Sequence, residues 1–290
     1  MCKSQLYNIL LLIILVICES SADSNQNLQY LLITQHNDDS KKVLFVIAHQ
    51  DDDAFIISRI KYFIDCKDEL FIIWTCKSYQ GDSTYGNIRI KESITAMDYI
   101  GLDSTSYKFL NYPDMNSYLY VPEIVNDIKE TISIFNPTEI YIQAYEMGNI
   151  DHDIAHFCTV QSLRELNYIC NVFEFPQYSA YNIGELLPFE LRKYPDTLIT
   201  VCNELNEINK GFVIEYWKFY ESQRFPMMYY FYFLGQLDNL FNLECFRKLP
   251  KYDYLKKPFN APAAYERYLP DVTYSDFHNA IYRYLKQEEK

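Results

Sequence analysis

A histidine and three consecutive aspartates follow an apolar run early in the sequence. The run Val43–Ala48 leads into His49 and, after one glutamine, into Asp51, Asp52 and Asp53. Adjacent carboxylates repel one another, so they are unfavourable to bury unless a cation or a set of hydrogen bonds holds them. A bound metal ion is the simplest cause of this pattern.

A second group of potential metal ligands lies further along the chain. The segment AYEMGNIDHDIAHF, residues 144–157, contains Asp151, His152, Asp153 and His156. A histidine, an aspartate and a second histidine on separate loops, with coordination positions left open, are typical of a catalytic metal site. The two segments therefore predict a metal-dependent enzyme, provided that the fold brings them together.

Short apolar runs alternate with amphipathic segments around both groups. Runs typical of buried strands are Val43–Ala48, Leu70–Thr75, Tyr107–Leu110 and Glu139–Gln143. Helices are expected over Ala54–Phe63, Ile88–Leu102 and Val121–Phe135, and from about Asp151. This alternation predicts an α/β fold, namely a Rossmann-like, doubly wound, mostly parallel sheet in a single domain. Ligands bind such sheets at the carboxyl ends of the strands, where both polar segments would lie.

Composition excludes one class of partner. The chain of 290 residues is 49% hydrophobic, which is ample for a buried core. Its formal net charge of -13 argues against nucleic acid, because binding the phosphate backbone requires clustered lysine and arginine.

The N-terminus has the layout of a secretory signal peptide over residues 1–22. Lys3 precedes the apolar run Ile9–Cys18, and small polar residues follow it. The run is too short to span a bilayer comfortably, so no transmembrane span is expected in the mature chain. The protein is therefore expected to be secreted, or to lie in the secretory lumen or the periplasm. A lipid anchor at Cys18 is disfavoured by the bulky residues before it.

Cysteines beyond the signal peptide are compatible with an oxidising compartment. Their number permits up to three disulfides, but the sequence does not choose the pairing, and several could simply be small buried residues. They are Cys66, Cys76, Cys158, Cys170, Cys202 and Cys245.

The two polar segments resemble the fingerprint of the PIG-L/LmbE-like family of zinc-dependent de-N-acetylases. The family's Ala-His-Pro-Asp-Asp-Glu corresponds to Ala48–Asp53, and its Gly-His-x-Asp-His corresponds to Gly148–His152. The similarity extends over about residues 43–225. Its further pieces are Arg89–Glu92, the run FLNYPD that ends at Asp114, and YESQ at Tyr220–Gln223.

The resemblance implies hydrolysis of the N-acetyl group of a GlcNAc-containing glycan, glycolipid or glycoconjugate. It assigns His49, Asp52 and His152 as ligands of Zn²⁺ or another divalent metal, and Asp51 as the general base. Acetate and a free amino sugar would be the products. The oligomeric state cannot be inferred from the sequence.

Three residues depart from the family pattern. Gln50 replaces a proline, and Asp53 replaces a glutamate and is expected to alter a contact behind the ligands. Asn149 stands where many relatives have a histidine thought to stabilise the oxyanion, so weaker activity or a different proton route is expected. Two alternatives to a de-N-acetylase remain. One is a catalytically weak or inactive sugar-binding relative, and the other is an amidase that acts on a non-sugar acyl amide.

Other polar residues admit two interpretations each. Arg89 and Glu92 either bind substrate and support the ligands, or form an exposed helical pair. Asp114 and Asp151 are expected to orient residues of the site, although the Asp114 motif is also an ordinary turn. His156, one helical turn after His152, is expected to pack or cap rather than to bind metal.

The chain beyond residue 225 says less about function. Residues 23–42 are expected to be a lead-in, residues 43–225 the deacetylase core, and residues 226–290 a C-terminal extension packed on the core. The aromatic run at residues 225–235 either lines a sugar pocket or is buried, and a helix is expected over Tyr274–Leu285.

Overall fold

A computed structural model describes residues 40–77, 83–177, 200–224, 241–258, 260–268 and 271–288. The expected signal peptide, most of the lead-in and the aromatic run at residues 225–235 lie outside the described residues. Residues from Ser40 onward form one compact unit. No helix in the described ranges is both long and apolar enough to cross a membrane.

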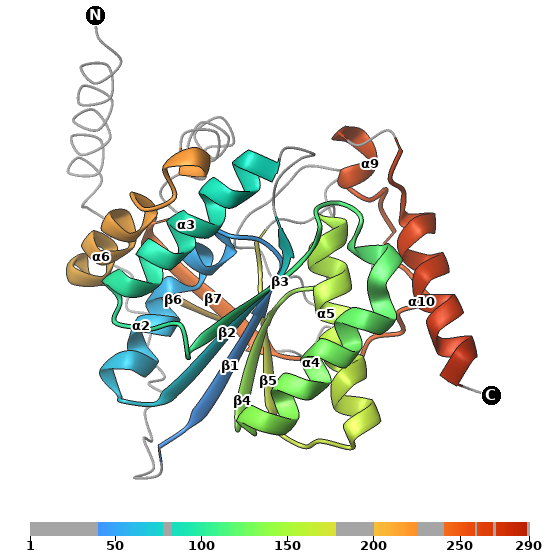
Figure 1. Ribbon diagram of the computed structural model, residues 1–290, viewed down its shortest axis with the longest axis horizontal. Coiled ribbons are helices and arrows are strands. Elements are labelled where there is room, and N and C mark those ends of the chain that lie inside the picture. Colours follow the sequence, from blue (N-terminus) through green and yellow to red (C-terminus); the bar gives the residue numbers. More distant parts are fainter. Residues whose placement is uncertain are drawn as a thin grey trace, which may run out of the picture. The chain divides into compact units, whose positions relative to one another are not determined.

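Seven strands of the described chain form one sheet in the order β3-β2-β1-β4-β5-β7-β6 (Figure 1). The strands are β1 (Lys42–Ile47), β2 (Glu69–Lys77), β3 (Tyr107–Pro113), β4 (Glu139–Gln143), β5 (Asn171–Phe175), β6 (Thr200–Glu204) and β7 (Leu243–Lys248). Neighbours from β3 to β5 are parallel, whereas β7 runs antiparallel to β5 and β6. The expected mostly parallel, Rossmann-like sheet is confirmed.

Helices cover both faces of this sheet. Side chains alternate along β1, so that Leu44 and Val46 enter the apolar cluster of α4, α5 and α10, while Phe45 and Ile47 enter that of α2, α3 and α6. Figure 1 shows these two sets of helices on opposite sides of the sheet. The helices are α2 (Ile57–Asp65), α3 (Ser83–Tyr99), α4 (Val121–Phe135), α5 (Ile150–Leu166), α6 (Glu207–Trp217), α9 (Tyr265–Tyr268) and α10 (Tyr274–Glu288), with 3-10 turns η1 (Asp52–Phe55) and η2 (Ser117–Tyr120).

The strand order places a topological switch point between β1 and β4. From β1 the chain moves to β2 and β3 on one side, and it then returns to β4 on the other side of β1. In open α/β sheets, ligands commonly bind at the carboxyl ends of the strands beside such a switch point. Both polar segments of the sequence follow these two strands.

Local structure differs from expectation after the aspartates. The helix expected from Ala54 is divided into η1 and α2, because Ile56 between them has φ -126° and leaves the helical region. By contrast, Val121–Phe135 and Glu139–Gln143 have the expected bounds.

The C-terminal extension does more than pack on the core. Its strand β7 lies within the sheet between β5 and β6, so this segment completes the sheet itself. The helix expected at Tyr274 is α10, which contributes Phe277 and Ile281 to the core.

Cysteines of the described chain are divided between thiols and a disulfide. Cys245 is disulfide-bonded, and the register of β6 and β7 places it opposite Cys202. The free thiols are Cys66, Cys76, Cys158 and Cys170.

Candidate metal centre and active site

A tight turn after β1 presents the first polar segment. The Asp52 N–H donates to the His49 carbonyl at 3.2 Å, and the Ala54 N–H donates to the Asp51 carbonyl at 3.0 Å. Asp51 has φ 106°, a left-handed conformation that aspartate tolerates better than most residues. Asp52 Oδ2 also accepts the His49 N–H at 2.6 Å. The turn therefore brings the side chain of Asp52 back to His49.

Helix α5 presents the second segment. Asn149 is its N-cap, and Asn149 Oδ1 accepts the Asp151 N–H at 2.8 Å. His152 consequently lies in the first turn of α5, directly beyond β4.

Three donor atoms from these two loops form a nearly equilateral triangle. His49 Nδ1 lies 3.2 Å from His152 Nε2, and each of these atoms lies 3.4 Å from Asp52 Oδ2. Ligands at about 2.0–2.1 Å from a tetrahedral metal are about 3.3–3.4 Å apart, so the spacing fits one ion. The three residues, all buried, could therefore hold a metal.

Two carboxylates lie behind His49. His49 Nε2 is 2.9 Å from Asp151 Oδ2 and 3.3 Å from Asp114 Oδ1. Asp151 also accepts from the backbone N–H groups of Met115 and Ser117, at 2.6 and 3.3 Å, and from the Ser117 hydroxyl. A carboxylate that holds one imidazole nitrogen leaves the other nitrogen directed at a metal. Asp114 and Asp151 thus both lie next to His49 Nε2, whereas His49 Nδ1 belongs to the triangle.

A second group of possible ligands shares His49. Donor atoms of His49, Cys76 and Asp151 lie within 4.8 Å of one another. This group contains one imidazole, whereas the His49–Asp52–His152 triangle contains two imidazoles and one carboxylate, a donor set known from catalytic zinc sites. The His49–Asp52–His152 triangle is thus the better metal site.

Asp51 is paired with a buried arginine. Arg89 on α3 donates to Asp51 Oδ1 and to the carbonyl of Gln50, and its side chain is buried. Burial raises the pKa of Asp51 to about 7, while the Arg89 cation opposes this shift. Arg89 is therefore not part of an exposed helical pair.

The charges of the site favour a cation. Burial opposes a charge on His49, but Asp114, Asp151 and Asp52 outweigh it and raise the pKa of His49 well above its usual range. Burial would raise the pKa of Asp52, but the two histidines hold it well below its usual range. Burial also lowers the pKa of His152, so its imidazole is available as a neutral ligand. The carboxylates around His49 therefore create an environment that attracts positive charge.

Asp53 lies in a separate network. It accepts the Trp74 indole N–H at 3.2 Å, the Tyr220 hydroxyl at 2.6 Å and the Tyr216 hydroxyl. Tyr220 belongs to the YESQ run, Tyr220–Gln223, so this run contacts the turn Asp51–Asp53 through Asp53.

Glu92 on α3 forms hydrogen bonds with the YESQ run. Its carboxylate accepts the Ser222 N–H at 2.8 Å and the Ser222 hydroxyl at 2.6 Å. Gln223 donates to the Tyr85 hydroxyl on α3. These contacts join α3, which carries Arg89, to the YESQ run.

His156 is engaged away from the metal triangle. His156 Nδ1 lies 2.7 Å from the Gln143 carbonyl, and Nε2 lies 2.9 Å from the Tyr254 hydroxyl. Burial lowers the pKa of His156 to about 4. Its contacts agree with the expected packing role.

Sequence reasoning missed two glutamines beside Asp52. Gln177 donates to Asp52 Oδ1, and Gln143 donates to Gln177 Oε1. Isolated glutamines have no motif, so only the three-dimensional structure connects them with the site.

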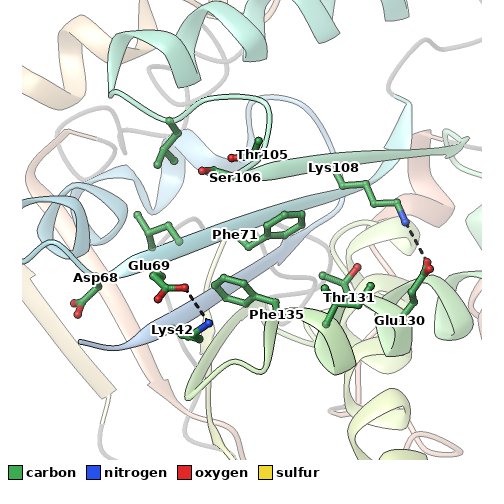
Figure 2. A pocket seen from close by; sticks show the side chains of 13 residues that line it. Lys42, Asp68, Glu69, Phe71, Thr105, Ser106, Lys108, Glu130, Thr131 and Phe135 are labelled. Carbon is green, nitrogen blue, oxygen red and sulfur yellow. Dashed lines mark ion pairs between the residues drawn. The ribbon is translucent and has the colours of Figure 1, made fainter. Parts of the chain in front are cut away.

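A cavity lies at the other end of the sheet from the triangle. Its volume is about 610 Å³, and it is bordered by the amino ends of β1 and β2 and by α4. Figure 2 shows Lys42 paired with Glu69, and Lys108 paired with Glu130, along this cavity. The metal triangle follows the carboxyl ends of β1 and β4, so this cavity is not the candidate site.

Comparisons with known proteins concern the fold and the sequence segments that carry the triangle. Residues 44–163, which include the triangle, match the family model PIG-L, described as GlcNAc-PI de-N-acetylase. The zinc-inhibited form of teicoplanin deacetylase Orf2 is similar over 73% of this chain and 98% of its own, with 14% identity and a TM-score of 0.55. The A40926 pseudoaglycone deacetylase Dbv21 is similar over 74% and 99%, with 16% identity and a TM-score of 0.56. No curated protein matches the sequence.

The structural likenesses show the fold, and the family match covers both polar segments. Residues 44–163 are therefore similar to the PIG-L family, and they include His49, Asp52 and His152.

Proposed function

We propose that the protein is a metal-dependent deacetylase that hydrolyses the N-acetyl group of an amino sugar in a GlcNAc-containing glycan or glycoconjugate. The observation that carries the proposal is the triangle of His49 Nδ1, Asp52 Oδ2 and His152 Nε2, with sides of 3.2 to 3.4 Å. The family's description and the deacetylase activity of both similar structures support this reaction class.

Zinc is the metal that we propose for His49, Asp52 and His152. Two imidazoles and one carboxylate suit zinc, although other divalent metals accept the same donors. When bound there, the metal would polarise an amide carbonyl and make water a stronger nucleophile.

Asp51 is the proposed general base. Its carboxylate accepts a proton from the attacking water as the new C–O bond forms. It then donates this proton to the amide nitrogen as the C–N bond breaks, so that acetate and a free amine are released. Arg89 holds the carboxylate in place and favours its charged form.

Asn149 is the proposed donor to the oxyanion. Its side-chain oxygen caps α5, which leaves the amide hydrogens as the groups that it can offer to a substrate. An amide carries no titratable proton, so this residue can stabilise charge but cannot transfer a proton. The same observation favours the second candidate function, a weakly active or inactive relative that binds sugars.

We also propose that the protein is secreted. Support comes from the signal-peptide pattern of residues 1–22 and from the disulfide at Cys245, since disulfides persist mainly in oxidising compartments. N-terminal sequencing of exported protein tests this, because cleavage near residue 22 is expected.

Metal content and acetate release together test the proposed activity. Purified wild type is compared with Asp52→Asn and His152→Asn, and with the matched controls Asp253→Asn and His278→Asn, whose positions lie outside the triangle. We expect about one zinc per chain and acetate release from N-acetylglucosamine conjugates, both retained in the controls and lost in the two site variants.

The other outcomes separate the alternatives. Zinc without turnover of any acetylated sugar favours the sugar-binding relative. Release of another acyl group from non-sugar amides favours an amidase. A wild type that binds no metal contradicts the proposal.

A further inference from the structure

The two carboxylate oxygens of Asp52 have different partners. Oδ2 faces His49 Nδ1 and His152 Nε2, each at 3.4 Å, whereas Oδ1 accepts a hydrogen bond from Gln177 Nε2. One oxygen therefore belongs to the metal triangle, and the other is held by a neutral amide.

A second glutamine fixes the orientation of Gln177. Gln177 Oε1 accepts from Gln143 Nε2, and Gln143 Oε1 accepts the backbone N–H of Ala48 at 2.8 Å. Further, the backbone N–H of Gln177 donates to Glu146 Oε2 at 3.3 Å, which holds the residue itself. The glutamine pair thus joins the ends of β1 and β4 to Asp52.

The direction of this chain is determined at both ends. A backbone N–H can only donate, so Ala48 must face the oxygen of Gln143. An ionised carboxylate can only accept, so Asp52 must face the nitrogen of Gln177. The hydrogen bond from Gln143 to Gln177 satisfies both requirements. Rotating either side-chain amide alone by half a turn would place two donors or two acceptors opposite each other.

Burial makes the chain of hydrogen bonds rigid. The exposed fractions of Ala48, Gln143, Gln177 and Asp52 are between 0% and 2%. Water therefore does not offer replacement partners, and an unpaired group at any position would cost free energy. Gln143 is further held by its carbonyl, which contacts His156.

We propose that Gln143 and Gln177 are positioning residues that fix Asp52 as a ligand through Oδ2 alone. The proposal rests on the proposed metal-binding function of His49, Asp52 and His152. Hydrogen bonds to the ligating carboxylate hold it in one orientation, and removing such partners commonly lowers metal affinity by about 10–100-fold.

Two substitutions test the proposal in different ways. Gln177→Leu removes the donor to Asp52. Gln143→Glu keeps the size of the side chain but replaces the amide that donates to Gln177 with an acceptor. Gln177 must then turn its nitrogen toward position 143, which places its oxygen, instead of its nitrogen, against Asp52. The matched control is Gln161→Leu, because Gln161 is also buried and contacts Glu165 on α5 at 3.1 Å.

Zinc affinity is measured by competition with a chromophoric chelator, and coordination by the visible spectrum of the cobalt-substituted protein. Both site variants are expected to raise the zinc dissociation constant by about 10–100-fold and to change the cobalt spectrum, whereas the control matches wild type. The thermal midpoint of each metal-free variant shows whether it folds. Should Gln177→Leu fail to fold, the nearly isosteric Gln143→Glu still provides the test.

Failure of the two proposals can be told apart. Wild-type affinity and spectrum in both folded variants would overturn the positioning role while leaving the metal site intact. Absence of metal binding in the wild type would overturn both proposals.

Discussion

His49 Nδ1 and His152 Nε2 lie 3.2 Å apart, although 103 positions separate the two residues in the chain. The parallel pairing of β1 with β4 produces this proximity, because Val46 is in register with Ile142 and both polar loops leave the same edge. With Asp52 Oδ2, the two nitrogens have the spacing of ligands to one metal. The proposed metal-dependent activity requires this proximity.

Metal binding should stabilise the folded protein through these ligands. At zinc concentrations about 100 times the dissociation constant, the free energy of unfolding should rise by about 2.7 kcal/mol. The rise should be absent in His152→Asn. Urea unfolding with zinc and with a chelator measures both values, and an equal rise in the variant would place the stabilising metal elsewhere.

Asp51 should act in the reaction without being needed for metal binding. Asp51→Asn removes the proton acceptor but leaves His49, Asp52 and His152 in place. Its kcat should fall by about 10²–10⁴-fold, the usual contribution of a general base, while zinc content stays near one per chain. Acetate release and elemental analysis on one preparation give both results. Full activity in this variant would exclude Asp51 as the base.

Arg89 should set the acidic limit of activity. The base must be deprotonated, so activity falls as pH falls through the pKa of Asp51. Since Arg89 lowers this pKa, Arg89→Met should raise it and move the acidic limb of the kcat/KM profile to higher pH. Arg89→Lys keeps the charge and serves as the control. Because a bound metal adds its own positive charge, all profiles are recorded with the same metal, and coincident acidic limbs would contradict the assignment.

The sequence predicts the part of the fold that depends on local patterns. Val121–Phe135 and Glu139–Gln143 have clear helical and strand patterns, and their observed bounds agree. The insertion of β7 between β5 and β6 depends on pairing between distant segments, which no local pattern encodes.

In the candidate site, too, some residues were predictable from local motifs and others were not. Histidine and aspartate motifs singled out His49, Asp52 and His152, and the structure brings these three side chains together. The direction of each side chain was not predictable. Asp53 continues the aspartate run, yet it contacts Trp74 and two tyrosines, and Gln177 joins the site from a segment without any motif.

Arg247 and Glu174 should be strongly coupled in stability. Arg247 Nε donates to Glu174 Oε1 at 2.6 Å across β5 and β7, and both side chains are buried. Arg247→Met leaves the carboxylate without its cation and should cost about 3–5 kcal/mol of unfolding free energy. The double variant with Glu174→Gln should recover much of this loss. Additive effects in urea unfolding would contradict the coupling.

His156 should make the protein sensitive to acid. Burial lowers its pKa to about 4, against about 6.5 in an unfolded chain, so the unfolded state binds a proton first as pH falls. Its contribution is fully present above about pH 6.5 and is lost progressively toward pH 4, a change of about 3 kcal/mol. In metal-free protein, His156→Gln should flatten the dependence of unfolding free energy on pH by this amount. An unchanged slope would show that His156 has the same pKa in the folded and unfolded states, which would contradict the effect of burial.

The most direct test of the central claim is an anomalous difference map at the zinc edge, from crystals grown with zinc. We expect a peak at about 2.0–2.1 Å from His49 Nδ1, Asp52 Oδ2 and His152 Nε2. A peak at Cys76 and Asp151 instead, or no peak within the triangle, would contradict the claim.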